Sequence, residues 1–87
     1  MKFRLLVDFE VVSYMSSLPR QDRLMLRGRF LQIQDFPGNF SDYQEKDAVG
    51  RSLEINLCGR YAIKYWTDEA DQQVKILDLH FADRGWK

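Results

Sequence analysis

Alternation of apolar and polar residues between residues 51 and 81 is the feature that most constrains the fold of this chain. Residues 51–57, 60–66 and 74–81 each alternate with a period of two and are rich in β-branched and aromatic side chains. Such alternation is typical of half-buried β-strands. Cys58-Gly59 fits a tight turn, because glycine adopts positive φ without a Cβ clash. We therefore predict a three-stranded antiparallel meander with one apolar face and one mixed polar face.

The residues before the meander predict a strand and two helices. Residues 2–8 alternate loosely and predict a strand at the sheet edge, since three strands alone make a poor platform for two helices. Residues 8–18 carry one apolar stripe at helical spacing, with Asp8 as the N-cap. Residues 20–36 predict a longer helix that Pro37-Gly38 ends. Residues 38–50 show no periodicity and predict a loop.

The longer helix carries two stripes. Leu26, Phe30 and Ile33 form the stripe that is expected to pack on the sheet. Leu24 and Leu31 form a second stripe, well round the helix, and three arginines lie between the two: Arg20, Arg23 and Arg27. Either the two leucines pack against the first helix while the arginines are solvated along their stems, or leucines and arginines together form the edge of a groove for a partner peptide.

Composition limits the class of protein. The chain has 87 residues, enough for one domain with one small core, and we predict a single α+β domain over residues 1–87. Thirteen basic and thirteen acidic side chains cancel, so no global field attracts nucleic acid or an anionic membrane. The single cysteine excludes an internal disulfide and fits a reducing cytoplasm. No apolar run is long enough to span a bilayer, and residues 2–8 are too short and too charged for a signal peptide.

The order of these elements resembles the RelE/ParE superfamily of bacterial toxins. The local sequence agrees: Leu18-Pro19 lies between the helices and Phe36-Pro37 follows the second. Residues 60–65, Arg-Tyr-Ala-Ile-Lys-Tyr, are similar to that family's Tyr-Arg-aliphatic-x-Tyr strand, and residues 76–84 to its last strand and basic tail. The resemblance covers nearly the whole chain, and most of its motifs are core patterns. It implies a RelE-like α+β fold with the order β-α-α-β-β-β, in which a two-helix hairpin packs on a small antiparallel sheet.

The resemblance also implies a function, the toxin half of a type II toxin–antitoxin module. RelE-like members bind the ribosomal A site and cut messenger RNA, whereas ParE-like members poison DNA gyrase. Both are silenced by an antitoxin protein that wraps the toxin surface. The resemblance implies no cofactor, and the carboxylates of this chain show no metal-ligand spacing.

The lysine/arginine site of the RelE-like members is absent from this chain. The matching positions are uncharged or acidic, and they are Glu54, Asn56, Ala62 and Ala82. The YoeB-like members of the superfamily instead use a glutamate and a C-terminal histidine as an acid–base pair, with arginine on the phosphate. By strand parity we place four candidates together on the mixed polar face: Glu54, Lys64, Asp78 and His80.

The roles in such a site follow the chemistry of RNA cleavage. Attack by the 2′-hydroxyl needs a base for its proton, cations for the phosphate and an acid for the leaving oxygen. Glu54 would be the base and His80 the acid, because an imidazole titrates near neutral pH. The phosphate clamp would come from Arg60, Lys64 and Arg84. The alternative interpretation of Lys64 is a plain cross-strand ion pair with Glu54, and that of His80 is a solvated surface group.

Three further residues carry a functional and a structural interpretation. Cys58 lacks a basic neighbour in sequence, so we expect an ordinary thiol rather than a nucleophile. Trp66 either stacks on a base of RNA or covers the end of the sheet. Trp86 either packs on the helices or contacts a partner.

Two hypotheses for function follow. The first is a toxin whose activity is either ribosome-linked RNA cleavage through an atypical site or inhibition of a protein such as gyrase. The second is a catalytically silent binding module that keeps only the antitoxin interface. A sequence pI near 6.6 argues against strong RNA binding, because phosphate neutralisation supplies much of that affinity.

Overall fold

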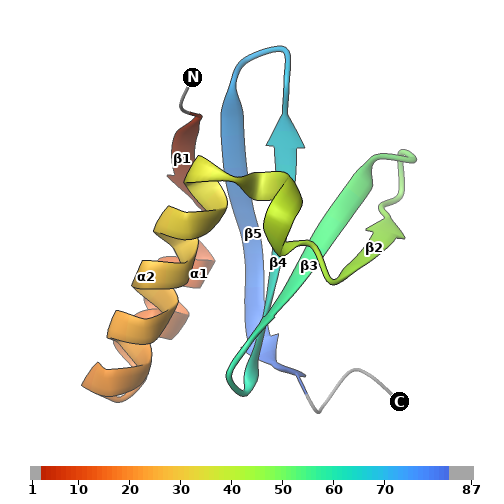
Figure 1. The fold of residues 1–87 in the computed structure, drawn as a ribbon. Helices are drawn as coiled ribbons and strands as arrows, with labels where there is room; N and C mark the ends of the chain where they lie inside the picture. The colour runs from red at the N-terminus through yellow and green to blue at the C-terminus, as the bar shows by residue number, and fades with distance from the viewer. Residues whose placement is uncertain (1–2, 83–87) are drawn as a thin grey trace.

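The computed structural model describes residues 3–82, which form one sheet with both α-helices on the same side (Figure 1). The elements follow in this order: β1 (Arg4–Val7), α1 (Phe9–Ser16), α2 (Arg20–Asp35), the 3-10 turn η1 (Pro37–Phe40), β2 (Tyr43–Lys46), β3 (Ser52–Cys58), β4 (Tyr61–Asp68) and β5 (Gln73–Phe81). The predicted α+β class, the edge strand, both helices and the meander are confirmed. No helix of the described residues is long and apolar enough to cross a membrane.

Within the described residues the sheet has five strands, in the order β1-β5-β4-β3-β2. The meander β3-β4-β5 is antiparallel, as predicted, but β1 pairs with β5 in parallel, so the sheet is mixed. The prediction of a structureless loop over residues 38–50 is wrong. Residues 37–40 form η1, and Tyr43–Lys46 pair with residues 52–55 of β3 as the outer strand β2.

The helix ends match the local sequence. Asp8 caps α1, its carboxylate accepting a hydrogen bond from the Glu10 N–H at 3.1 Å. Pro19 directly precedes α2, where its missing N–H costs nothing. After Asp35 the chain leaves the helical conformation at Phe36, which precedes Pro37.

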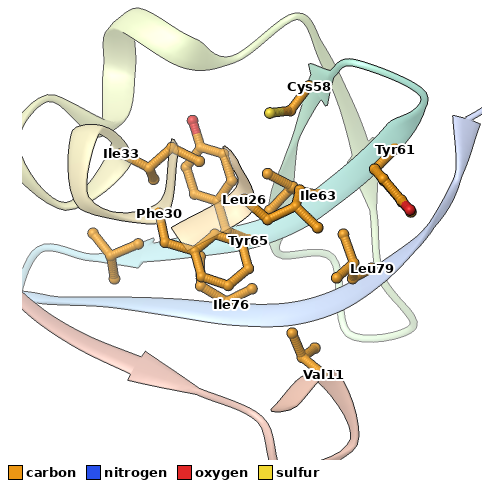
Figure 2. Packing of buried hydrophobic residues seen from close by; sticks show 11 residues of the cluster. Val11, Leu26, Phe30, Ile33, Cys58, Tyr61, Ile63, Tyr65, Ile76 and Leu79 are labelled. Carbon is orange, nitrogen blue, oxygen red and sulfur yellow. The ribbon is translucent and has the colours of Figure 1, made fainter. Parts of the chain in front are cut away.

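The core lies between α2 and the strands β4 and β5. Leu26, Phe30 and Ile33, the predicted inner stripe of α2, are at most 4% exposed. Figure 2 shows this stripe beside Tyr65 and Ile76 of the sheet. Val11 of α1 closes the other end of the cluster. At roughly 1.5–3 kcal/mol for each fully buried large apolar side chain, this cluster is the main source of stability.

Candidate functional site

The two faces of the sheet differ in what covers them. Directly paired residues of neighbouring strands project to the same side of a sheet. The residues of β3 and β4 that share the helix-covered face are therefore Cys58, Asn56, Glu54, Tyr61, Ile63 and Tyr65. The opposite face, here called the open face, is not covered by either helix (Figure 1). Its side chains include Lys64, Trp66, Lys75, Asp78 and His80.

Glu54 does not lie with the other predicted site residues, and the parity argument that placed it there is wrong. Cys58 pairs directly with Tyr61, which leaves only Gly59 and Arg60 as turn residues. A two-residue turn pairs odd-numbered residues of one strand with even-numbered residues of the next. The alternating apolar residues of β3 therefore lie on the same face of the sheet as Lys64, and not on the face of Tyr61. Glu54 consequently points to the helix side of the sheet.

On that side Glu54 anchors the segment between η1 and β2. Its carboxylate accepts a short hydrogen bond from the Ser41 hydroxyl. The Gln44 amide donates to both carboxylate oxygens, at 3.2 and 3.1 Å. A polar hollow of about 470 Å³ lies beside these groups, and Asp42 and Tyr43 contribute to its lining. The local contacts of Glu54 are those of a structural anchor.

A buried polar network next to Glu54 was not foreseen from the sequence. Asn56 is 3% exposed, and its amide nitrogen donates to the Phe40 carbonyl at 2.8 Å and to Asp42 at 3.3 Å. Arg29 of α2 donates to the Asn56 amide oxygen at 2.9 Å and stacks over the Phe40 ring. The network ties α2, η1 and β3 together. The only sequence signal for this network is the polar Asn56 in the middle of a strand whose apolar residues predict burial.

The open face brings the remaining predicted residues together in two pairs. His80 Nδ1 lies 3.1 Å from an Asp78 carboxylate oxygen, on a half-exposed part of β5. Lys64 is the direct cross-strand partner of Asp78, and its ammonium reaches across β3 to Glu45 of β2 at 3.2 Å. Lys64 thus pairs with Glu45, and the predicted cross-strand pair with Glu54 is wrong.

Arg60 lies at the end of the sheet next to His80. It occupies the β3–β4 turn, and its carbonyl accepts a hydrogen bond from the Ala82 N–H at 2.8 Å. Ala82 follows β5, so the exposed Arg60 and the half-exposed His80 are at the same end of the β4–β5 ladder. Lys64, Asp78 and His80 thus lie together on the open face without Glu54, and Arg60 lies in the turn at the same end of the β4–β5 ladder. The other predicted residues, Arg84 and Trp86, lie outside the described residues.

Three buried groups have raised pKa values. The hydroxyl of Tyr61 donates to Asp22 at 2.6 Å, and this hydrogen bond, with burial, raises the pKa of Tyr61 to about 12. Burial, and then the charge of Glu54, raises the pKa of Tyr65, whose hydroxyl donates to the Pro37 carbonyl. Burial also raises the pKa of the Cys58 thiol, against the charge of Arg29, which agrees with an unreactive thiol.

A second candidate surface lies on the helices. A groove of about 550 Å³ runs between α1 and α2, and its lining includes the apolar Val7, Met15 and Phe30 together with Arg23. Arg23 is fixed there by donating to the Leu18 carbonyl at 2.6 Å. The second stripe of α2, Leu24 and Leu31, is about half-exposed and does not line this groove. Four apolar side chains of the two helices are about half-exposed or more: Phe9 79%, Val12 48%, Leu24 49% and Leu31 48%. Of these, Val12 lines the groove.

Three arginines follow one side of α2 near this groove. Arg20 and Arg27 are exposed and lie on the same side of the helix as Arg23, at i, i+3 and i+7. None of the ion pairs within residues 3–82 involves these three arginines. The three arginines and the four half-exposed apolar side chains of α1 and α2 together make up what we call the hairpin surface: Phe9, Val12, Arg20, Arg23, Leu24, Arg27 and Leu31.

Comparison with known proteins places the fold. No protein-family model and no curated protein matches the chain. Among solved structures, the archaeal RelE-RelB complex from Pyrococcus horikoshii OT3 contains a chain that matches with a TM-score of 0.81 and 22% identity, covering 98% of this chain and 100% of that one. The chain has the RelE fold. The toxin-antitoxin complex RelBE2 from Mycobacterium tuberculosis agrees, with a TM-score of 0.80 at 12% identity over 93% of this chain and 99% of its own.

The RelE fold explains which parts of the sequence could be recognised. At 22% and 12% identity the likeness is one of fold, and it extends over nearly the whole chain. In this chain Glu54 and Asn56, the positions expected from the resemblance to match the RelE lysines, hold the segment around η1 through hydrogen bonds to Ser41 and the Phe40 carbonyl.

Proposed function

We propose that this protein is the toxin of a type II toxin–antitoxin module. The observation that carries the proposal is the superposition of nearly the whole chain on members of two toxin–antitoxin complexes. Fold alone does not decide function, so a surface that suits an antitoxin is needed as well. The hairpin surface supplies this second support.

The partner of this toxin is a cognate antitoxin that binds the hairpin surface. The exposed Leu24 and Leu31, with the apolar lining of the groove, suit the apolar stripe of an amphipathic helix. The three arginines of that surface make none of the described ion pairs, so they favour acidic residues along the edge of the partner helix. An antitoxin with an acidic amphipathic segment therefore complements this surface in both shape and charge.

The activity that the open face supports is cleavage of messenger RNA on the ribosome. Asp78 orients His80, which gives its proton to the 5′-oxygen as the phosphorus–oxygen bond breaks. Lys64 and Arg60 hold the phosphate oxygens. The 2′-oxygen forms the new bond to phosphorus, and its proton passes to water, because Glu54 lies on the other side of the sheet.

A second activity, inhibition of a protein target such as DNA gyrase, is favoured by two observations. The net charge of the chain is zero, which is unusual for a protein that docks on ribosomal RNA. The separation of Glu54 from His80 also removes the acid–base pair of the YoeB-like members. A toxin that acts by occupying a protein surface requires neither basic charge nor a proton shuttle.

Growth arrest and RNA mapping distinguish these activities. Wild-type protein, His80→Ala and Lys64→Ala are induced in turn, and new 5′ ends in messenger RNA are mapped. Lys46→Ala is the matched control, because Lys46 is exposed on the other side of the sheet beside Ser52. Cuts inside translated codons that disappear in both open-face variants, and persist in the control, support cleavage. Arrest without cuts supports a protein target, and unimpaired growth would overturn the toxin proposal in favour of a binding module.

A further inference from the structure

Trp66 holds two cations at the end of the open face that is remote from His80. The guanidinium carbon of Arg51 lies 4.6 Å from the centroid of the Trp66 ring, and the ammonium of Lys75 lies 4.9 Å from it. Lys75 is the direct partner of Trp66 on β5, whereas Arg51 directly precedes β3. Two cations from either side of the central strand β4 thus meet on one indole.

The carboxylate beside Arg51 is engaged in a turn. Asp47 accepts hydrogen bonds from the Val49 and Arg51 N–H groups and from Arg51 Nε. Burial opposes the charge of Asp47, but these hydrogen bonds together lower its pKa. The ion pair is made through Nε, so the terminal nitrogens of the guanidinium, on a side chain that is 44% exposed, are available to another acceptor.

The contact of Lys75 with its neighbouring carboxylate is weaker than that of Arg51. Its ammonium lies 3.9 Å from the Asp68 carboxylate, beyond hydrogen-bond distance. Asp68 itself caps the β4–β5 turn by accepting from the Asp71 N–H at 3.2 Å. Proteins that bind single-stranded nucleic acid combine such aromatic rings, on which a base stacks, with cations that contact the adjacent phosphates.

From this geometry we infer that Arg51, Trp66 and Lys75 form a stacking subsite for one nucleotide of a single-stranded RNA. The inference rests on the proposed RNA activity, since it extends the path of the strand along the open face away from Lys64 and His80. On binding, the base replaces a cation on the indole, and that cation moves to the flanking phosphate. The subsite reads no sequence, because every base has a face to stack.

Binding of a short 2′-O-methyl RNA, which this chemistry cannot cleave, tests the subsite directly. Affinity is measured by fluorescence anisotropy for wild type, Trp66→Ala, Trp66→Phe and the double variant Arg51→Gln/Lys75→Gln. We expect the RNA affinity to fall roughly tenfold in Trp66→Ala and to be almost fully retained in Trp66→Phe. The reason is that stacking requires an aromatic ring but does not require the indole N–H. The double variant should flatten the salt dependence by roughly 1.4 in log–log slope. The control variant Lys46→Gln should leave both the RNA affinity and its salt dependence unchanged.

The outcomes separate this inference from the proposed function. Equal RNA affinity of Trp66→Ala and wild type, with circular dichroism showing both folded, would overturn the subsite even where growth arrest and RNA cutting persist. Loss of binding in Trp66→Ala and Trp66→Phe alike would also overturn it, because stacking would then not be the cause. If Trp66→Ala impairs antitoxin binding and leaves RNA binding unchanged, the subsite is a protein contact and the inference fails.

Discussion

Asn56 has both polar groups of its side-chain amide satisfied inside the protein. Its nitrogen donates to a carbonyl of η1 and to Asp42, and its oxygen accepts from Arg29. Glu54, two residues earlier on the same side of β3, completes the attachment through Ser41 and Gln44. These side chains hold η1 and β2 against the sheet. The contacts of Glu54 and Asn56 therefore serve stability.

Replacing Asn56 tests this role. We expect Asn56→Ala to lower the free energy of unfolding by roughly 1–3 kcal/mol, because the Phe40 carbonyl and the Arg29 guanidinium each lose a hydrogen bond to a buried side chain. Urea denaturation measures the change. The exposed Glu10→Ala is the control, and an effect of Asn56→Ala no larger than that of Glu10→Ala would contradict the assignment.

The Tyr61–Asp22 hydrogen bond predicts a specific pH dependence. The pKa of Tyr61 is raised from 10.0 to about 12, so the folded state holds this proton more tightly than the unfolded chain. The stabilisation is therefore complete below pH 10.0 and is lost as the pH rises towards about 12. Asp22→Asn should bring the tyrosine pKa down. Tyrosinate absorbance during alkaline titration measures this change, and Tyr61→Phe identifies the contribution of Tyr61 to the absorbance. An unchanged titration midpoint of Tyr61 in Asp22→Asn would refute the prediction.

At the scale of elements, the sequence predicts what apolar periodicity encodes. Both helices and the three strands of the meander follow from their stripes. β2 does not, because Tyr43–Lys46 is a short edge strand of four exposed residues with no apolar alternation. The failed placement of Glu54 has a different cause, since both faces of β3 are largely buried: Ile55 is 1% exposed on one and Asn56 3% on the other. Alternation alone could not say which face met the helices, and only the turn length decides it.

The β3–β4 turn yields a test at this scale. Gly59 has φ +60, and a Cβ there would lie 3.0 Å from Met25 Cε. We expect Gly59→Ala to destabilise the protein by about 1 kcal/mol through backbone strain. Gly38→Ala is the control, because a Cβ at Gly38 meets nothing within 4 Å. Thermal unfolding of the two variants gives the comparison, and equal midpoints would contradict the argument.

The hairpin surface provides a second test at the scale of elements. Arg20→Glu/Arg27→Glu reverses the charge of that surface without touching the core, and we expect it to weaken antitoxin binding by roughly tenfold or more. Arg4→Glu, on the exposed side of β1, is the matched charge control. Affinity is measured by titration of purified proteins. The docking proposal fails if both variants bind like wild type, or if reversal of Arg4 has the larger effect.

Across the whole molecule the net charge is zero, but the charged side chains are unevenly distributed over the surface. Three arginines outside the described ion pairs collect on α2, whereas several cations of the open face lie beside a carboxylate: Lys64 with Glu45, Arg51 with Asp47 and Lys75 with Asp68. Composition reports only the sum, so the neutrality read from the sequence could not locate either surface. We expect antitoxin binding to weaken with added salt more steeply than RNA binding does, because the charge of the hairpin surface is less compensated. Affinities at several salt concentrations measure this, and parallel slopes would contradict it.

The parallel pairing of β1 with β5 has a consequence for biosynthesis. β1 leaves the ribosomal exit tunnel well before its partner strand, Gln73–Phe81, because Arg4 aligns with Gln73. Until β5 emerges the edge strand has no neighbour, and α1 and α2 can cover only part of a sheet. Closure of the fold is thus a late event that joins segments distant in the translated chain. A nascent copy of this protein cannot present its finished surfaces until β5 has left the ribosome.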